Sequence, residues 1–161
     1  MHNPQWQAVA CWPCARRTLI DGRLLDTSVL VPLFFNETGT AAARLALAQE
    51  PSLWISHWTL AEFASAVAFK LRNGQVSDAV ADRARQLFQA FTTSQLTVVD
   101  VLREDFANAA DLCRTTPAPG LRTPDALHLA VAQRLGLSLV SFDAALMQAA
   151  RGHGVACRNS E

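Results

Sequence analysis

The stretch Leu24-Leu25-Asp26-Thr27-Ser28-Val29-Leu30-Val31 places a carboxylate inside an apolar run. Continuous apolar runs rich in β-branched residues are typical of a strand covered on both faces. We therefore predict that Leu24-Leu25 and Val29–Val31 belong to the first, buried strand. Asp26 alone could be a turn residue, but burial of an unpaired carboxylate is costly. Its position inside this run therefore favours a functional role.

Outside this stretch, short apolar segments alternate with helical patterns. Further strands are predicted at residues 53–56, 96–99 and 137–141, with an edge strand at 155–157. Helices are predicted at residues 41–50, 59–72, from 78 onward after a Ser77 cap, at 103–114, at 124–135 and from 143 or 144 to 152. This alternation predicts an α/β fold, a three-layer α/β/α sandwich with a mostly parallel central sheet.

The length of 161 residues favours one domain with one core. Residues 1–20 show no clear helical or strand period, so we expect a poorly ordered N-terminal extension before a domain at 21–161. Within this extension, Cys11 and Cys14 resemble a redox dithiol motif. The flanking sequence lacks the strand and helix that normally hold such a motif, so the spacing is interpreted as chance.

The helical patterns also indicate one helix cap and predict which side chains point inward. Thr59 and Glu62 have the spacing of a capping box, in which the acid reaches back to the first backbone N–H of the helix. In the two helices that follow, the predicted inward sets are Val80, Ala84, Leu87, Phe88 and Phe91, and then Phe106, Ala110 and Cys113.

Three further acids lie at junctions between elements. Glu62 lies in Thr59-Leu60-Ala61-Glu62, Asp125 in Thr123-Pro124-Asp125-Ala126, and Asp143 in Ser141-Phe142-Asp143. Taken singly, they could be a capping-box acid, a complement to the helix dipole and an N-cap. Together with Asp26 they repeat one type of position. In an alternating α/β chain those junctions lie on one edge of the sheet, where ligands bind, so the set favours a joint functional role.

Four carboxylates on one edge would repel one another unless a cation lies among them. A divalent metal is the simplest such cation, and Mg²⁺ prefers oxygen ligands while keeping several waters. At an acidic edge it would serve phosphate-ester chemistry, because it activates water and offsets the charge on phosphate oxygens. His128, one turn after Asp125, could face the same edge or could be a hydrogen-bonded structural histidine.

The order of these motifs resembles the PIN domain, and in particular the VapC-type toxins of bacterial toxin–antitoxin pairs. The motifs are Leu-Asp-Thr-Ser at 25–28, Ala-Glu-Phe at 61–63, Pro-Asp-Ala-Leu-His-Leu-Ala at 124–130 and Val-Ser-Phe-Asp at 140–143. The resemblance covers residues 24 to about 158, and Arg122-Thr123-Pro124-Asp125-Ala126-Leu127-His128 is its most specific part.

This resemblance implies a metal-dependent ribonuclease that uses Mg²⁺ or Mn²⁺. Carried over residue by residue, the catalytic acids are Asp26, Glu62, Asp125 and Asp143, the metal ligands are Asp26, Asp125 and Asp143, and the supporting or substrate-binding residues are Ser28, Arg122 and Ser141. The implied partners are an RNA substrate and a cognate antitoxin.

Composition adds expectations about partners and location. The formal net charge is zero, so no global positive field attracts nucleic acid. Charged residues make up 17% of the chain, below the typical share of about 25%. Together with the apolar helices around Phe63, Phe69, Phe88 and Phe91, this predicts a homodimer. No apolar run has the length of a membrane span, so we expect a soluble cytoplasmic protein.

Two other functions compete with a nuclease. A catalytically degenerate PIN-like domain could bind RNA or protein without cutting, but all four acids are present. A phosphatase of the haloacid dehalogenase type also begins with an Asp after a strand. Its second Asp lies two residues later, where this chain has Ser28.

Overall fold

The computed structural model describes residues 21–48, 52–117 and 120–158. The expected N-terminal extension, with Cys11 and Cys14, lies outside these residues. The described strands form one five-stranded parallel sheet in the order β3-β2-β1-β4-β5. Their bounds are Arg23–Leu25 (β1), Leu53–Ser56 (β2), Leu96–Val99 (β3), Ser138–Val140 (β4) and Cys157–Arg158 (β5).

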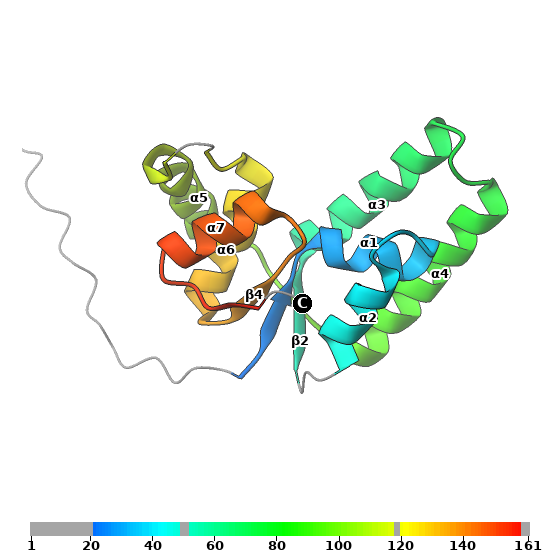
Figure 1. The fold of residues 1–161 in the computed structure, drawn as a ribbon, viewed down its shortest axis with the longest axis horizontal. Helices are drawn as coiled ribbons and strands as arrows, with labels where there is room; N and C mark the ends of the chain where they lie inside the picture. The colour runs from blue at the N-terminus through cyan, green and yellow to red at the C-terminus, as the bar shows by residue number, and fades with distance from the viewer. Residues whose placement is uncertain (1–20, 49–51, 118–119, 159–161) are drawn as a thin grey trace, which may run out of the picture.

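The helices cover both faces of this sheet (Figure 1). One face carries α1 (Thr27–Phe35), α2 (Thr40–Ala48), α3 (His57–Arg72) and α4 (Asp78–Gln95), and the other carries α5 (Arg103–Thr115), α6 (Thr123–Leu135) and α7 (Ala144–Gly152). Leu24 packs in the core with α5, α6 and α7, whereas the next residue, Leu25, packs in the core with α1, α3 and α4. The predicted three-layer α/β/α sandwich is confirmed.

The order of the strands creates a switch point between β1 and β4. From β1 the chain builds the sheet through β2 to β3, and it then returns to add β4 on the other side of β1. In open α/β sheets, ligands bind beyond the carboxyl ends of the strands at such a point. Asp26 follows β1 and Ser141 follows β4, so both residues lie at this crevice.

The first strand is shorter than predicted. It ends at Leu25, and Val29–Val31 belong to α1 rather than to the strand. Helix α1 contacts α2, α3 and α4 and is apolar around most of its circumference. A helix that is apolar all round is a buried helix, and a short apolar run of this kind fits either structure. The prediction failed because it extended the strand through Asp26, which is the residue preceding α1.

Helix α3 begins earlier than predicted, and its cap differs. Ser56 Oγ accepts a hydrogen bond from the backbone N–H of Thr59 at 3.3 Å, and Thr59 Oγ1 accepts one from the backbone N–H of Ser56 at 3.3 Å. The alternative interpretation of Glu62 as the acid of a capping box with Thr59 is therefore wrong. Because another residue caps the helix, the carboxylate of Glu62 is available to the crevice.

Several predicted inward faces also change. Ala84 and Phe88 are buried on α4, but Val80 and Leu87 are exposed. Phe63 and Phe88 stack in the core with their ring centroids 3.8 Å apart. Phe63 and Phe88 were expected to contribute exposed apolar surface, but both are buried.

On α5 the prediction of an inward Phe106 is wrong, since this side chain is 54% exposed. Ala110 is also exposed, and Ala109 and Leu112 form the inward face. Asp105 is buried instead, because its carboxylate accepts hydrogen bonds from Arg134 Nε of α6 and from the backbone N–H of Leu102, both at 2.8 Å.

Among the described helices, none combines the length and the apolar character that crossing a membrane requires.

Candidate active site

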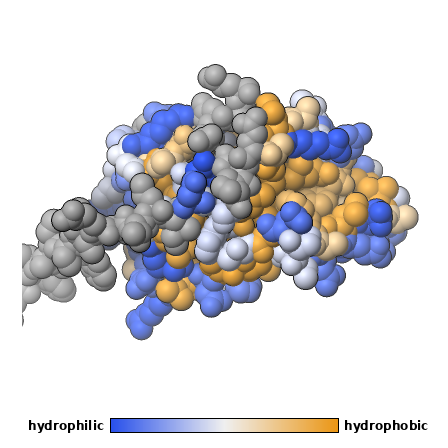
Figure 2. Space-filling view, turned by 90° about the horizontal axis from the view of Figure 1, so that it is seen from below, coloured by the Kyte–Doolittle hydropathy of each residue, from blue (hydrophilic) through white to orange (hydrophobic). Residues whose placement is uncertain are grey.

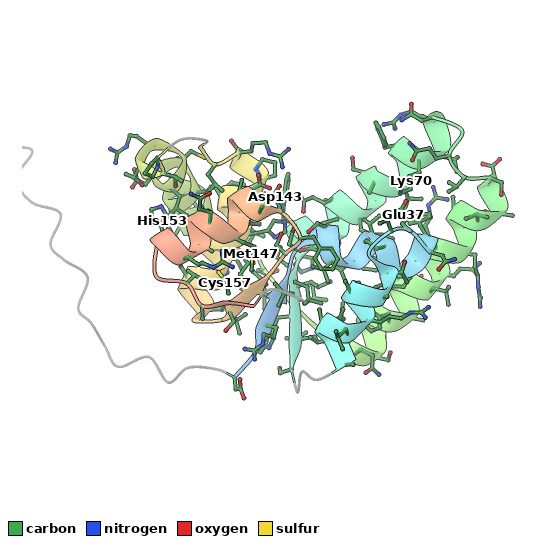
Figure 3. The ribbon with its side chains drawn as sticks, viewed as in Figure 1. Glu37, Lys70, Asp143, Met147, His153 and Cys157 are labelled. Carbon is green, nitrogen blue, oxygen red and sulfur yellow. The ribbon has the colours of Figure 1, made fainter. Side chains whose placement is uncertain are left out.

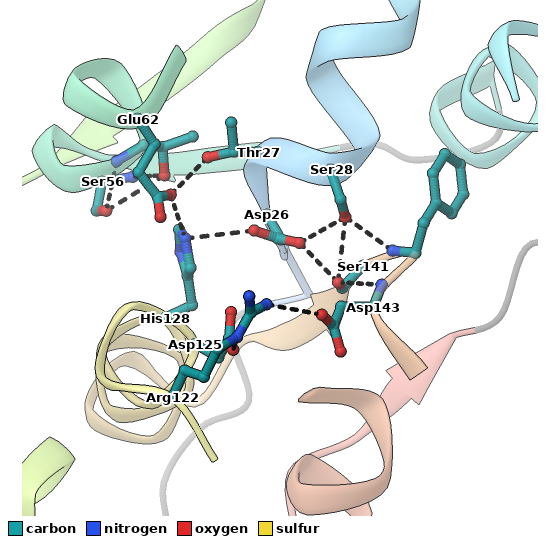
Figure 4. A network of polar contacts seen from close by, with 12 residues as sticks. Asp26, Thr27, Ser28, Ser56, Glu62, Arg122, Asp125, His128, Ser141 and Asp143 are labelled. Atoms are coloured by element: carbon teal, nitrogen blue, oxygen red, sulfur yellow. Dashed lines mark hydrogen bonds and ion pairs between the residues drawn. The ribbon is translucent and has the colours of Figure 1, made fainter. Parts of the chain in front are cut away.

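The four acids singled out in the sequence meet at the crevice beyond the carboxyl ends of β1 and β4 (Figure 4). They come from four different elements, since Asp26 follows β1, Glu62 lies on α3, Asp125 lies in the first turn of α6, and Asp143 precedes α7. Asp26 and Asp125 are buried, and Glu62 is partly buried.

Two serine hydroxyls hold the carboxylate of Asp26. Ser28 Oγ and Ser141 Oγ donate to Asp26 Oδ2 at 2.5 and 2.6 Å. The same two oxygens accept hydrogen bonds from the backbone N–H groups of Phe142 and Asp143, each at 2.9 Å. Each hydroxyl oxygen thus accepts one backbone N–H and donates its single proton to Asp26. The segment after β4 therefore fixes the orientation of the acid that follows β1.

His128 joins Glu62 to Asp26. Its Nε2 lies 2.6 Å from Glu62 Oε2 and 3.3 Å from Asp26 Oδ1, and the side chain is 1% exposed. Thr27 Oγ1 also donates to Glu62 Oε2 at 2.6 Å. The structure thus places His128 at the crevice, where its neighbours are two of the four acids.

Charges in this cluster shift the pKa values of both partners. Burial opposes protonation of His128, but the hydrogen bond with Glu62 and the charges of Asp26, Glu62 and Asp125 outweigh it and raise the pKa of His128. Burial raises the pKa of Glu62, yet the hydrogen bonds and charge of His128 and the hydrogen bond from Thr27 more than offset it, so the pKa of Glu62 is lowered. Both shifts favour an imidazolium–carboxylate pair.

Arg122 joins the other two acids. Its Nε donates to Asp125 Oδ2 at 2.9 Å, and its Nη2 donates to Asp143 Oδ2 at 3.1 Å. Burial raises the pKa of Asp125, and repulsion by Asp143 and Asp26 adds to this, so the pKa stays above its usual value despite the neighbouring guanidinium. Asp143 Oδ1 accepts the backbone N–H of Leu146 at 2.9 Å, so Asp143 is also the N-cap of α7.

The sequence argument required a cation among the four acids, and the protein supplies two. His128 lies between Asp26 and Glu62, and Arg122 lies between Asp125 and Asp143, so each pair of acids has one cation and about half of the negative charge is compensated. A signal for His128 lay in the sequence, since it lies three residues after Asp125 and so on the same face of α6. Arg122, in contrast, is the N-cap residue with an extended backbone and reaches Asp125 from outside the helix.

The donor set fits a divalent cation. One ligand atom each from Asp26, Glu62 and His128 lie within 4.8 Å of one another. The carboxylate oxygens suit Mg²⁺ or Mn²⁺, and His128, as an imidazolium, would donate to these carboxylates rather than bind the metal.

Several solved structures are similar to this chain in fold, and one of them is described as a toxin. VapC20 of Mycobacterium tuberculosis, described as a toxin that cleaves the sarcin–ricin loop, is 19% identical, with a TM-score of 0.63 over 79% of this chain and 94% of that chain. VapBC2 of Rickettsia felis, solved with a DNA fragment from its promoter, is 18% identical, with a TM-score of 0.62 over 86% and 98%. FitAcB of Neisseria gonorrhoeae is 19% identical, with a TM-score of 0.61 over 86% and 97%.

At these identities the similar structures establish the fold. A comparison with curated proteins finds no match. A comparison with protein families matches residues 23–152 to the PIN domain. This match spans most of the chain, includes all four acids and agrees with the fold, and the chain therefore belongs to the PIN-domain family.

Proposed function

We propose that this protein is a metal-dependent endoribonuclease that hydrolyses RNA phosphodiester bonds, and that it is the toxin of a type II toxin–antitoxin pair. The observation that carries the proposal is the convergence of Asp26, Glu62, Asp125 and Asp143 at the switch point of a PIN-domain sheet. A non-catalytic PIN-like domain would not need four acids close together, because their mutual repulsion has to be reduced by Arg122 and His128.

In this proposal Asp26, Asp125 and Asp143 hold Mg²⁺ or Mn²⁺. The bound metal would lower the pKa of a water and offset negative charge on the phosphate. Asp26 is pre-oriented for its role, because Ser28 and Ser141 occupy Oδ2 and leave Oδ1 directed toward Glu62 and His128.

Glu62 is proposed to orient the attacking water and to accept its proton. The hydrogen bonds from His128 and Thr27 favour the ionised carboxylate, which can accept a proton, although the lowered pKa of Glu62 makes it a weaker base. Thr27 and His128 both contact Oε2, so this oxygen is engaged while Oε1 remains the oxygen that can contact the water.

The proposed RNA substrate must bind through local features, because the net charge of the chain is zero. Arg122 is the cation of the site that can reach a phosphate, since its guanidinium side chain is 76% exposed. Guanidinium groups bind phosphate oxygens in a bidentate manner. VapC20, which shares this fold, is described as cleaving an RNA loop, and this supports RNA as the substrate class.

The proposed protein partners are a second copy of the chain and an antitoxin. Figure 2 shows apolar surface over the half of the molecule that contains α1 to α4. Exposed large apolar side chains on these helices are Leu45, Phe69, Val80 and Leu87. Contiguous exposed apolar surface marks interaction sites. A groove lined in part by Val31, Ala66 and Phe69 begins at Glu62, and an antitoxin segment lying there would cover the acids.

The far end of this groove is firmly held. Lys70 of α3 pairs with Glu37 from the turn between α1 and α2 (Figure 3), and its Nζ lies 5.3 Å from the centroid of the Phe35 ring. The ion pair and the cation–π contact tie α3 to α1. These contacts fix the relative position of α1 and α3 at this end of the groove.

The experiment that tests the proposal is cleavage of a mixed RNA pool by purified protein in Mg²⁺. Wild type should leave 5′-phosphate and 3′-hydroxyl ends, and Asp125→Asn should lose at least about 100-fold in rate, because it removes a ligand charge without changing shape. Arg85→Gln, which breaks an exposed ion pair with Asp82 away from the site, should cut at the wild-type rate. Products with 2′,3′-cyclic phosphate, or a folded Asp125→Asn variant with full activity, would refute the proposal.

Growth of a bacterial host tests the toxin claim. Expression of the wild type should arrest growth, and expression of Asp125→Asn should not. If a soluble, RNA-cleaving protein is harmless at high expression, the chain is a nuclease but not a toxin.

A further inference from the structure

We propose that Arg122 is an internal competitor of the metal: it occupies Oδ2 of Asp125 and Oδ2 of Asp143 in the metal-free protein and must release these two oxygens before they bind a cation. This inference rests on the proposed function, because it concerns the same carboxylates. It assigns Arg122 a positioning role that precedes any contact with RNA.

The bonds of Arg122 occupy Oδ2 of Asp125 and Oδ2 of Asp143, two oxygens that a bound metal could use. The guanidinium bridges two acids from different elements, Asp125 of α6 and Asp143 before α7, through a separate nitrogen for each. Asp143 has both oxygens engaged, Oδ2 by Arg122 and Oδ1 by the N-cap bond from Leu146. The cap stabilises α7, so Oδ2 is the oxygen that becomes available when Arg122 leaves.

The position of Arg122 allows it to leave, unlike that of His128. The guanidinium side chain is 76% exposed, and the charges of Asp125 and Asp143 hold it. Ion pairs at this exposure contribute little energy each. His128 is 1% exposed between Asp26 and Glu62 and has no comparable route to solvent. The site therefore has one fixed internal cation and one that can be displaced.

The backbone of Arg122 keeps the displaced side chain close to the site. Arg122 is the N-cap residue of α6, with an extended backbone (φ −75°, ψ 151°), and Pro124 follows in the first turn. Asp125 begins the buried face of the same helix. A guanidinium displaced from Asp125 and Asp143 consequently stays within side-chain reach of any phosphate held there. A guanidinium released from the two carboxylates would therefore be free to bind that phosphate.

The test measures binding of Mn²⁺ alone to the full chain, without RNA, by the electron paramagnetic resonance signal of free Mn²⁺. Arg122→Gln should lower the Kd for Mn²⁺ about three- to tenfold, since exposed ion pairs are individually weak and tenfold corresponds to about 1.4 kcal/mol. The matched control is Arg85→Gln, which removes one positive charge from another exposed i,i+3 pair. It should leave the Kd within about twofold.

Two results overturn the inference in different ways. If wild type binds Mn²⁺ through the acids, as shown by weakened binding in Asp125→Asn, but Arg122→Gln binds no more tightly than Arg85→Gln, then Arg122 does not compete and the proposed nuclease site still stands. If wild type does not bind Mn²⁺, or if Asp125→Asn binds it as tightly as wild type does, the acids do not form a metal site. Both the metal site and the inference are then refuted.

Discussion

Replacing Asp26 by asparagine should destabilise the metal-free protein, although it removes one of four clustered negative charges. If the carboxylates simply repelled one another, neutralising one would stabilise the fold. The contacts of Asp26 predict the opposite, a loss of free energy of unfolding. Asp26 is 6% exposed and accepts hydrogen bonds from Ser28 and Ser141, while His128 balances its charge.

The magnitude follows from these contacts. Charge-assisted hydrogen bonds are roughly twice as strong as neutral ones, so the two hydroxyl bonds at 2.5 and 2.6 Å would each lose about 0.5–1 kcal/mol with an amide acceptor. At the other oxygen, 3.3 Å from His128 Nε2, the amide would present no negative charge to the imidazolium, which costs about 1 kcal/mol or more. The expected loss is about 2–4 kcal/mol.

Urea unfolding followed by circular dichroism, in excess chelator and at one protein concentration, measures this loss. Asp143→Asn is the matched control, because asparagine preserves the N-cap bond to Leu146 and removes only a contact with the exposed Arg122. It should cost about 1 kcal/mol or less. If Asp26→Asn is as stable as wild type or more so, the compensation that we assign to His128 and the two serines is refuted.

Three further predictions concern regions outside the site. Asp105→Ala should lower the free energy of unfolding by about 3 kcal/mol, because it leaves Arg134 without its buried partner; urea unfolding checks this, and a loss below about 1 kcal/mol would show that the pair is dispensable. A chain that begins at Asp21 should keep RNA cleavage at the wild-type rate, since all four acids lie downstream; a folded but inactive product would assign a function to the removed residues. Light scattering at micromolar concentration should give the mass of a dimer, because apolar side chains remain exposed on α2 to α4; a monomer would refute the dimer.

The sequence was informative wherever local chemistry decides the structure. The strands Leu53–Ser56 and Leu96–Val99 have the predicted bounds, and Gly136 ends α6 with φ 69°, which favours glycine. The positions of the four acids at junctions between elements could also be recognised in the sequence, because the carboxyl ends of parallel strands lie at the same edge of a sheet. Local patterns of this kind need no knowledge of distant partners.

Predictions from the sequence were wrong where a contact with a residue far along the chain determines the local structure. Residues Val29–Val31 are helical because α2, α3 and α4 surround them, and an apolar run cannot show this. Asp105 points inward because Arg134, 29 residues later, meets it. The roles of Arg122 and His128 depend on how α6 is rotated against the sheet, which fixes the acids that each side chain reaches.

The most direct measurement of the central claim is RNA cleavage by wild-type protein during removal and return of metal. The protein is stripped with excess EDTA and assayed on the mixed RNA pool, and Mg²⁺ or Mn²⁺ is then added in excess of the chelator. The account predicts loss of cleavage in EDTA, recovery on addition of either metal, and no recovery in Asp26→Asn. Cleavage that continues undiminished in EDTA, with clean controls lacking the protein, would contradict it.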